Sequence, residues 1–271
     1  MNKIDEVKNY WDNRPCNVRH SKETPGTELF YNQVEAKKYF VESHIPVFAD
    51  FSKWKGKKVL EIGCGLGTET INFARAGAEV TAIELSTGSL DLAKMRAKIF
   101  GLQDKIKFFQ GNAEELNTFI NFEQFDLIWS FGVIHHSPNP EKIIQQIRYF
   151  MNSQTELRIM LYYKYSWKVF WILMKYGKGK FWKLKKLIAQ YSEAQIGCPV
   201  THVYSKSDVK KLLKGFKIKE IHIKHIFSWK IPEYKSNVYK KVWYFKWLPK
   251  KIFNWLEKRF GWHLCVKAVL Q

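Results

Sequence analysis

The sequence predicts an α/β protein built on a doubly wound sheet of seven strands, with helical insertions after strands five and six. Two observations predict this class. Strand patterns and helix patterns alternate from Val59 to about residue 150, which is typical of parallel βαβ units. Three further strand patterns follow in the rest of the 271-residue chain, separated by two stretches that are rich in lysine and aromatic residues.

The first strand leads directly into a glycine-rich turn. Residues 59–62 (VLEI) have the pattern of a buried parallel strand in which Glu61 is the one polar residue. Gly63, Gly65 and Gly67 follow at alternate positions, where they let the backbone turn tightly and let a ligand approach without Cβ atoms in the way. The helical pattern that comes next would point its N-terminus at that ligand.

The second strand, residues 79–83, ends in Glu84. This acid lies 17 residues after Gly67, about where a ribose-binding carboxylate belongs, so the pattern predicts a nucleoside cofactor. A dinucleotide fingerprint, G-x-G-x-x-G, would require a glycine at position 68, where this chain has Thr68. The observed spacing is G-x-G-x-G, which favours another cofactor.

This spacing resembles the first motif of class I S-adenosylmethionine-dependent methyltransferases, E-x-G-x-G-x-G. Three later segments resemble the second, third and fourth motifs of that family, in order and at family spacing: 82–86 (AIELS), 110–114 (QGNAE) and 125–136 (FDLIWSFGVIHH). The resemblance covers residues 55–160 and is strongest to the ubiquinone/menaquinone-type branch. It implies a Rossmann-like class I methyltransferase core at residues 51–163.

The resemblance also implies which residues bind S-adenosylmethionine. The three glycines would pass under its methionine portion, with Glu61 near the ammonium, and Glu84 would accept both ribose hydroxyls. Asn112, where the family more often has Asp, would contact the adenine edge, and Phe131 would face the sulfonium and the methyl group. The implied cofactor-binding residues of the core are Glu61, Gly63, Gly65, Gly67, Glu84, Leu85, Asn112, Ala113, Ser130 and Phe131.

A general base is expected close to the end of strand four. His135 and His136 follow that strand, and an imidazole with a pKa near 6.5 suits proton removal from a hydroxyl or an amine. The other interpretation is that these histidines cap the next helix or line the pocket. His202, near the end of the first insertion and with Glu193 and Gln195 upstream, is the rival catalytic candidate.

Residues 1–50 are expected to fold over the cofactor as a lid. A leading segment often does so in this superfamily, and Tyr10 and Trp11 would then shield the site. Polar side chains of the same arm would bind a carboxylate or phosphate of the substrate. The substrate-binding candidates are Arg14, Arg19, His20 and Tyr31, with Glu28 and His44 as further pocket residues. The alternative is that the aromatic residues dock the arm and the cations are solvated.

The C-terminal half has to complete the sheet. The patterns predict strand five at 155–163, a serine-capped helix at 205–213, strand six at 216–227 and strand seven at 263–270. Two insertions remain, at 164–204 and, within the completing segment 205–271, at 228–261. Ligands bind beyond the carboxyl ends of the strands in such sheets, so we expect the first insertion to cover the pocket and the second to lie beside it.

Charge separates the two halves of the chain. The formal net charge is +20, and residues 161–271 account for all of it, with 25 Lys and Arg against 5 Asp and Glu. Eight of the 11 tryptophans lie there too. Within 164–190, Trp167, Phe170, Trp171 and Met174 recur at helical spacing among eight lysines.

Three interpretations of this basic, aromatic composition are open. The aromatic stripes pack into a core while the lysines are solvated. Alternatively, Trp, Phe and Lys form an interfacial surface for an anionic membrane or a lipid-like substrate, or they line a nucleic-acid groove. Lys outnumbers Arg by 38 to 7, which disfavours nucleic acid because bidentate base and phosphate recognition usually recruits arginine.

Several absences narrow the expected setting. The N-terminus has no apolar core, so no signal peptide is expected, and the apolar run at 169–174 is far too short to span a bilayer. The four cysteines are widely spaced with no C-x-x-C pair, and no acids cluster near strands four and five. We therefore expect no metal site and no disulfide framework, and a reducing cytoplasm fits this cysteine usage.

The sequence thus predicts a cytoplasmic S-adenosylmethionine-dependent methyltransferase that acts on an O, N or C atom of a small-molecule or lipid-like acceptor. The [DN]-P-P-[YFW] motif of nucleobase amino-methyltransferases is replaced here by residues 130–133 (SFGV). The alternatives are a methyltransferase acting on nucleic acid or protein, and a non-catalytic, membrane-peripheral binding module on the same fold. No oligomeric state is predicted.

Overall fold

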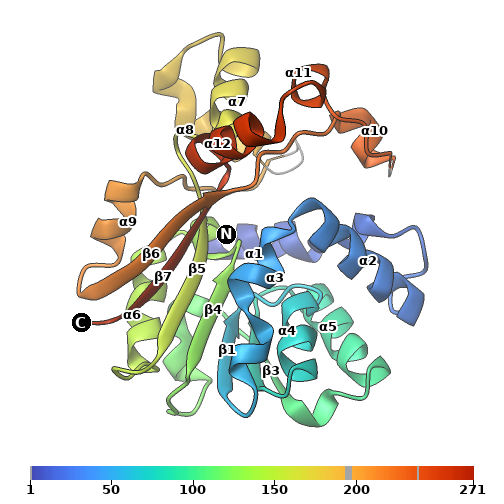
Figure 1. Cartoon of the computed structure of the whole chain (residues 1–271). Coiled ribbons are helices and arrows are strands. Elements are labelled where there is room, and N and C mark those ends of the chain that lie inside the picture. The colour runs from blue at the N-terminus through green and yellow to red at the C-terminus, as the bar shows by residue number, and fades with distance from the viewer. Residues whose placement is uncertain (1, 193–196, 237) are drawn as a thin grey trace.

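A computed structural model describes residues 2–192, 197–236 and 238–271 of the chain. Its seven-stranded sheet has the strand order β3-β2-β1-β4-β5-β7-β6 (Figure 1), which confirms the predicted fold class. The strands are β1 (Lys58–Ile62), β2 (Glu79–Glu84), β3 (Ile106–Gln110), β4 (Leu127–Phe131), β5 (Glu156–Tyr162), β6 (Phe216–Lys224) and β7 (His263–Leu270).

β1 lies at the point where the strand order reverses. It pairs in parallel with β2 on one side and with β4 on the other. β5 continues the parallel set beside β4, whereas β7 runs antiparallel to both β5 and β6. In such a sheet the connections that leave the two strands at the reversal diverge, so a crevice forms beyond their carboxyl ends.

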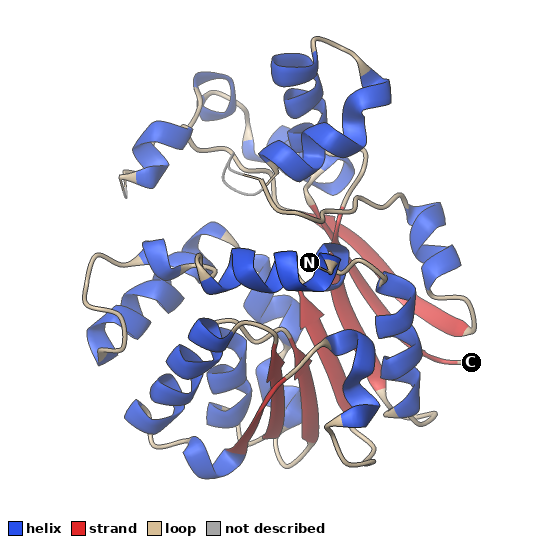
Figure 2. Cartoon of the chain, turned by 180° about the vertical axis from the view of Figure 1, so that it is seen from behind, coloured by secondary structure: helices blue, strands red, loops and turns tan. Residues whose placement is uncertain are grey.

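Helices cover both faces of the sheet (Figure 2). Ile71 and Phe73 of α4 belong to the same buried cluster as Trp129 of β4, together with residues of α3 and α5. Ile143 and Ile147 of α6 belong to a second cluster, together with residues of α9. The α-helices are α1 (Lys3–Asp12), α2 (Glu28–Val41), α3 (His44–Ala49), α4 (Thr68–Arg75), α5 (Thr87–Ile99), α6 (Pro140–Tyr149), α7 (Trp167–Gly177), α8 (Leu184–Tyr191), α9 (Lys206–Leu212), α10 (Ile231–Lys235), α11 (Trp243–Lys246) and α12 (Lys250–Phe260). The 3-10 helices are η1 (Val18–His20), η2 (Phe51–Trp54), η3 (Gln103–Lys105), η4 (Ala113–Thr118), η5 (Ile134–His136) and η6 (Phe181–Lys183).

Serine side chains begin three of these helices. The hydroxyl oxygens of Ser86, Ser166 and Ser205 accept hydrogen bonds from backbone N–H groups three residues further along the chain. At Ser205 the cap is reciprocal, because the carboxylate of Asp208 accepts from the Ser205 N–H. The serine-capped helix predicted at 205–213 is confirmed as α9.

Strands five and six are shorter than predicted. Thr155 lies just before β5 and donates its hydroxyl hydrogen to the carbonyl of Phe125 instead of joining the ladder. β6 ends at Lys224, three residues before the predicted end, because His225 adopts a left-handed conformation with φ of 68°. The alternation that predicted a longer strand continues past the point where the backbone turns.

A buried arginine fixes the N-terminal arm to the sheet. Arg158 of β5 is 2% exposed, and its Nη1 donates to the carbonyls of Phe48 at 2.6 Å and Ala49 at 2.9 Å. These carbonyls end α3, where backbone oxygens have no partner within the helix. The arm therefore has a fixed place against β5, and His44 at the start of α3 is held near the carboxyl end of the sheet.

The two insertions lie together at one end of the molecule, beyond the carboxyl end of β5 (Figure 1). The first contains α7, η6 and α8, and the second contains α10, α11 and α12. The ring of Trp167 lies 5.9 Å from that of Tyr244 and 6.1 Å from that of Phe245, so the insertions are in direct contact. Among the described residues, no helix is long and apolar enough to cross a bilayer.

The aromatic stripe of α7 does not form a buried core face throughout. Val169 and Ile172 are the buried apolar residues of this helix, whereas Phe170 is 52% exposed and Met174 is 51% exposed. Spacing alone does not reveal which side of an amphipathic helix is covered. The interpretation of the stripe as core is therefore wrong for Phe170 and Met174.

Candidate functional site

A cavity opens beyond the carboxyl ends of β1, β2 and β4. Ile4 and Val7 of α1 close it from the side of the arm. Its wall includes these residues that the sequence predicted for the site: Trp11, Gly63, Gly65, Glu84, Leu85, Asn112, Ala113, Phe131 and His136. The cavity thus brings together the arm and residues from all four of the sequence motifs named above.

The glycine-rich turn forms one wall of the cavity. Gly63 has φ of 77°, and a Cβ on it would lie 2.2 Å from Cγ2 of Val133, so only glycine lets the turn pass against the segment after β4. Gly65 has φ of 55°, and a Cβ on it would meet no atom within 4 Å. Gly67 is the N-cap of α4 and does not line the cavity. The turn therefore leaves open space beside Gly65.

Glu84 holds this turn in place from the end of β2. Its Oε2 accepts a hydrogen bond from the Gly65 N–H at 2.8 Å, and its Oε1 accepts one from the Ser86 N–H at 2.9 Å. Burial raises the pKa of the Glu84 carboxyl, and the backbone hydrogen bonds oppose that shift. A carboxylate has about four acceptor positions, so both oxygens can accept further bonds from a ligand.

Of the two acids Glu61 and Glu69, only Glu69 lines the cavity. Glu61 is 2% exposed, is not part of the cavity wall, and accepts a hydrogen bond from the Thr70 hydroxyl at 2.5 Å. Glu69 of α4 lines the cavity, and its Oε2 pairs with Nζ of Lys38 at 2.5 Å. Its buried Oε1 has no hydrogen-bond partner among the described residues. Glu69 is therefore a second acid of the cavity wall beside Glu84, with one oxygen that no described residue engages.

The residues after β3 and β4 divide between the cavity wall and the layer beneath it. Asn112 and Ala113 line the cavity, and Oδ1 of Asn112 accepts from the Glu114 N–H at 3.0 Å as the cap of η4. Phe131 lines the cavity at the end of β4. Ser130 does not, because its side chain points into the interior and donates to the Ile62 carbonyl at 3.3 Å.

The three candidate histidines lie in different environments. His136 lines the cavity, and its Nδ1 lies 2.9 Å from the Val200 carbonyl. The same Nδ1 lies 3.3 Å from Oγ1 of Thr201 and 3.4 Å from Sγ of Cys198. Because the carbonyl can only accept, we assign the proton of the neutral ring to Nδ1, with Nε2 as the basic nitrogen. His135 is fully buried against Tyr162 with a ring separation of 3.7 Å, and burial lowers its pKa well below the usual range. His202 is half-buried outside the cavity, and burial lowers its pKa too.

The arm residues also separate. Trp11 lines the cavity and its ring lies 5.4 Å from that of His136, whereas Tyr10 lies beside Lys186 and Cys198 at a separate surface depression. Among the substrate-binding candidates, Nη1 of Arg14 is buried without a partner among the described residues, and Arg19 is exposed. Neither lines the cavity.

His20 and Tyr31 also lie outside the cavity. Nε2 of His20 lies 3.2 Å from the Tyr234 hydroxyl, so this histidine contacts the second insertion. Tyr31 is fully buried and donates its hydroxyl hydrogen to the Leu92 carbonyl at 2.6 Å. Tyr31 therefore joins α2 to α5 and has no exposed surface for a substrate. Glu28 is exposed at the start of α2, and Glu193 and Gln195 lie outside the described residues.

Several cavity residues had no signal in the sequence. Lys38 and Glu69 come from α2 and α4 and meet only in the fold, and Cys16 and Asn17 precede η1. Asn17 has φ of 66°. Polar residues near a proline indicate a turn at this position, but they do not indicate that the turn lines a cavity. His44, a minor pocket candidate, lies instead against His263.

Comparison with known proteins points to one family. A family model described as a methyltransferase domain matches residues 53–217. Among curated proteins, the ubiquinone biosynthesis O-methyltransferase of Haemophilus ducreyi is 38% identical over 96 residues, covering 34% of this chain and 40% of that protein. The Psychrobacter cryohalolentis enzyme of the same name is 37% identical over 89 residues, covering 33% of this chain and 34% of that protein. The aligned part is thus less than half of either relative.

Solved structures share the fold over the whole chain at low identity. The magnesium protoporphyrin IX methyltransferase of Synechocystis, solved with bound S-adenosylhomocysteine, is 14% identical with a TM-score of 0.60 and full coverage of both chains. The geranyl diphosphate C-methyltransferase of Streptomyces coelicolor is 12% identical with a TM-score of 0.63, covering 100% of this chain and 99% of that one. Both similarities support the fold.

Glu61→Gln tests the buried acid beneath the cavity. Burial, together with the nearby charge of Glu69, raises the pKa of Glu61 to about 8, whereas an unfolded glutamate has a pKa of about 4.3. Between these values the unfolded chain releases the proton while the folded chain keeps it, so the free energy of unfolding falls as pH rises from about 5 to about 8. In Glu61→Gln, we expect this fall to be smaller by at least ~1 kcal/mol in urea unfolding series.

The matched control is Glu79→Gln, which removes an exposed acid from the start of β2. It should keep the pH dependence of the unaltered protein. The same pH dependence in Glu61→Gln and in the unaltered protein would show that Glu61 is ionised in the folded state.

Proposed function

The chain belongs to the family of methyltransferase domains, and from that premise we propose that it transfers a methyl group from S-adenosylmethionine to a small-molecule or lipid-like acceptor. The observation that carries the proposal is the cavity beyond β1, β2 and β4, where an open glycine turn lies between two acidic side chains. The ubiquinone biosynthesis O-methyltransferases that match this chain support an acceptor of this kind.

The residues of the cavity fit S-adenosylmethionine. The open space beside Gly65 accepts a ligand that a Cβ would obstruct, and Glu84 keeps acceptor positions for a ribose diol. The unpartnered Oε1 of Glu69 suits a ligand ammonium, so we assign to Glu69 the role that the resemblance gave to Glu61. Asn112, Ala113 and Leu85 remain our candidates for contacts with the adenosine portion.

S-adenosylmethionine, when bound, supplies a methyl group that is already activated for displacement. The chain has to hold the acceptor in line, exclude water and take a proton where the acceptor needs to lose one. Trp11 and Phe131 provide apolar wall, and the bond from His136 to the Val200 carbonyl leaves Nε2 as the proton acceptor. We therefore propose His136 as the general base. His135 has no exposed surface, and His202 lies outside the cavity.

Glu84→Gln tests cofactor binding. The substitution keeps the side-chain volume but removes the charged acceptor, and hydrogen bonds to charged groups contribute about 1.5–3 kcal/mol each. We expect S-adenosylmethionine to bind about 10–100-fold more weakly by isothermal titration calorimetry. Glu79→Gln, on the same strand but exposed, is the control and should bind normally. A folded protein that binds neither S-adenosylmethionine nor S-adenosylhomocysteine would refute the proposed function.

His136→Gln tests the proposed base. Formation of S-adenosylhomocysteine is measured across a panel of phenols, catechols and primary amines, and the acceptor that turns over is then used for both variants. Loss of a general base lowers turnover by about 10²–10⁴-fold, while cofactor affinity should change little. His202→Gln, altered outside the cavity, should retain turnover. Full activity of His136→Gln with a hydroxyl or amine acceptor would exclude this histidine as the base.

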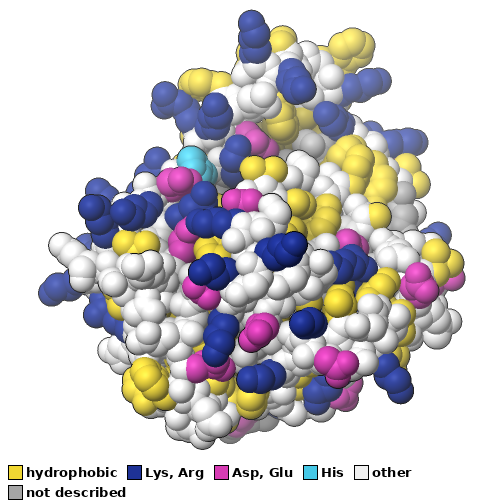
Figure 3. All heavy atoms as spheres, turned by 60° about the horizontal axis from the view of Figure 1, so that its bottom comes forward, with side chains coloured by type: hydrophobic (Ala, Val, Ile, Leu, Met, Phe, Trp, Pro, Cys, Tyr) yellow, Lys and Arg dark blue, Asp and Glu magenta, His cyan; other side chains and the backbone are white. Residues whose placement is uncertain are grey.

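We also propose that the insertions make peripheral contact with an anionic membrane. Large aromatic side chains are exposed on them: Phe181 is 71% exposed, Trp182 67%, Trp243 71% and Trp247 78%. The 25 cations and 5 acids of residues 161–271 make this end of the chain strongly basic. The uppermost lobe in Figure 3 accordingly carries dark-blue and yellow side chains. Exposed Trp and Phe among lysines suit the interface of an anionic bilayer.

This contact would bring the cavity close to a lipid-like acceptor. The composition favours a membrane over nucleic acid as the partner, because lysine outnumbers arginine 38 to 7. A cytoplasmic location remains a prediction. A nucleic-acid or protein acceptor and a non-catalytic role are the alternatives to the proposed function.

The membrane contact is tested with the double variant Trp243→Ser/Trp247→Ser. Co-sedimentation is measured with vesicles of phosphatidylcholine alone and of phosphatidylcholine mixed with phosphatidylglycerol. We expect the unaltered protein to bind the mixed vesicles and the double variant to bind at least tenfold more weakly, a difference of about 1.4 kcal/mol. Phe122→Ser, which removes an exposed aromatic residue outside the insertions, is the control. Equal binding of all three proteins to the mixed vesicles would contradict the contact. So would binding of the unaltered protein to DNA but not to the vesicles.

A further inference from the structure

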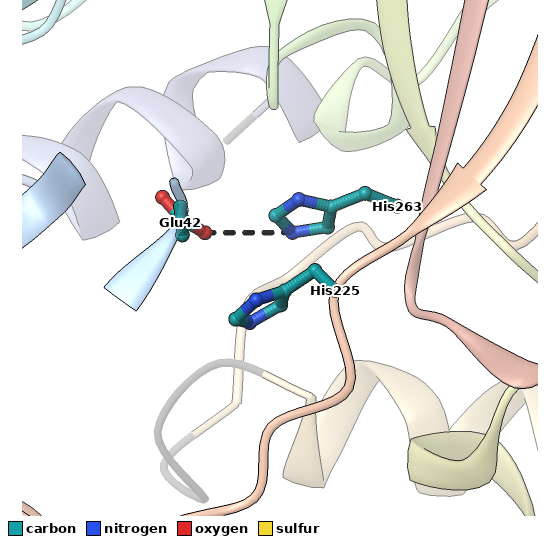
Figure 4. Close-up of side chains that lie close together, drawn as sticks. All are labelled: Glu42, His225 and His263. Carbon is teal, nitrogen blue, oxygen red and sulfur yellow. Dashed lines mark ion pairs between the residues drawn. The ribbon is translucent and has the colours of Figure 1, made fainter. Parts of the chain in front are cut away.

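Three histidines and a glutamate gather at a second place in the fold, outside the cavity. Glu42 follows α2, His44 begins α3, His225 follows β6 and His263 begins β7. The rings of His225 and His263 are stacked with centroids 4.7 Å apart, and the ring of His44 lies 5.1 Å from that of His263. Figure 4 shows Glu42 and both stacked rings directed toward a common space.

Three of these side chains have the separations that a metal ion requires. One ligand atom from each of Glu42, His225 and His263 lies within 4.8 Å of the other two. Nε2 of His263 and Oε1 of Glu42 are 3.5 Å apart. Ligand atoms on a tetrahedral Zn²⁺, with bonds of about 2.0–2.2 Å, stand roughly 3.3–3.5 Å from each other. One pair is already at that separation, and a ring nitrogen of His225 lies within 4.8 Å of both other ligand atoms.

We propose that Glu42, His225 and His263 bind a divalent first-row transition-metal ion, with Zn²⁺ the ion that this donor set suits best. Two imidazoles and one carboxylate are a common ligand set for such ions, and three protein ligands leave a position open for water or for a substrate oxygen.

His44 acts as the outer partner of this site. Its Nε2 lies 3.0 Å from Nδ1 of His263. When Nε2 of His263 holds the ion, the Nδ1–H donates to His44, which fixes both the tautomer and the orientation of the His263 ring. Such an outer hydrogen bond is usual for metal-binding histidines, and the structure already contains it.

The two imidazoles of the site are shielded from solvent. His263 is 3% exposed and His225 is 8% exposed. A metal ion binds the neutral imidazole. The carboxylate of Glu42 supplies the negative charge that a divalent ion needs beside neutral ligands.

The backbone at His225 is itself unusual. Its φ of 68° lies in the left-handed region, which ends β6 and directs the ring against His263. The His225 carbonyl accepts a hydrogen bond from the Trp262 N–H at 2.7 Å, which holds the segment after β6 to the start of β7. Backbone conformations of this kind cluster at ligand sites, where the surrounding structure maintains them.

The site is one side chain away from the cofactor cavity. The ring of Phe131, which lines that cavity, lies 5.6 Å from His263 and 6.0 Å from His44. Phe131 therefore lies between the proposed metal site and the cofactor cavity. Metal binding is measured without methyl transfer, so failure of this inference and failure of the proposed function are separate results.

The test uses the full chain, stripped with a chelator and then titrated with Zn²⁺ against a chromophoric competitor. We expect one tightly bound ion per chain. Titration with Co²⁺ should produce visible absorption bands characteristic of four- or five-coordinate nitrogen and oxygen ligation. His225→Ala and Glu42→Gln should each weaken binding at least tenfold, and His44→Ala should weaken it about 10–100-fold as an outer partner.

His222→Ala is the matched control, because His222 is an exposed histidine of β6 that pairs with Glu220 at 2.9 Å. It should bind Zn²⁺ as the unaltered protein does. Circular dichroism confirms the fold of each variant, and Glu42→Gln, altered at a partly exposed side chain, serves where a histidine variant unfolds. Absence of a stoichiometric ion, or equal loss of binding in His222→Ala, would overturn the proposal.

Discussion

The cavity depends on the close approach of two loops that leave neighbouring strands. Gly63 follows β1 and Val133 follows β4, and they lie so near that a Cβ on Gly63 would stand 2.2 Å from Cγ2 of Val133. The absence of a side chain at Gly63 lets the two loops meet at the strand-order reversal, where they would otherwise diverge. The bond from the Gly65 N–H to Glu84 then fixes the turn to β2. With the turn held on both sides, its open space faces Asn112 and Phe131.

Patterns local to the chain predicted the parts of the fold that depend on local interactions. Strand seven at 263–270 was predicted with its observed bounds, and the helix at 205–213 was predicted from its serine cap. Strand six was predicted too long, because alternation continues past His225 while the backbone turns there. The cofactor motifs placed Glu84, Asn112 and Phe131 at the cavity, since each ends or closely follows a strand whose carboxyl end faces it.

Side chains that meet only through tertiary packing could not be predicted in this way. Lys38 pairs with Glu69 across two helices, and Tyr31 bonds to the Leu92 carbonyl, contacts that no periodicity encodes. The cluster of Glu42, His225 and His263 joins segments more than 180 residues apart, in a chain whose cysteine spacing gave no reason to expect a metal site. Helical spacing showed that the insertions are amphipathic, but it did not show that Phe170 and Met174 face outward.

The position of Arg158 connects these features. By holding the carbonyls of Phe48 and Ala49, it fixes α3 against β5, and α3 begins at His44. His44 then meets His263, where the chain re-enters the sheet after the second insertion. The arm, the sheet and the second insertion thus converge beside Phe131, where His44 and His263 meet. The sequence motifs reach the cavity wall at the ends of β1, β2 and β3, whereas this convergence involves the arm and the segment that follows the second insertion. On the proposed function, selectivity for the methyl acceptor depends on the arm, because Ile4, Trp11 and Lys38 supply side chains to the cavity wall whereas no described residue of the insertions does.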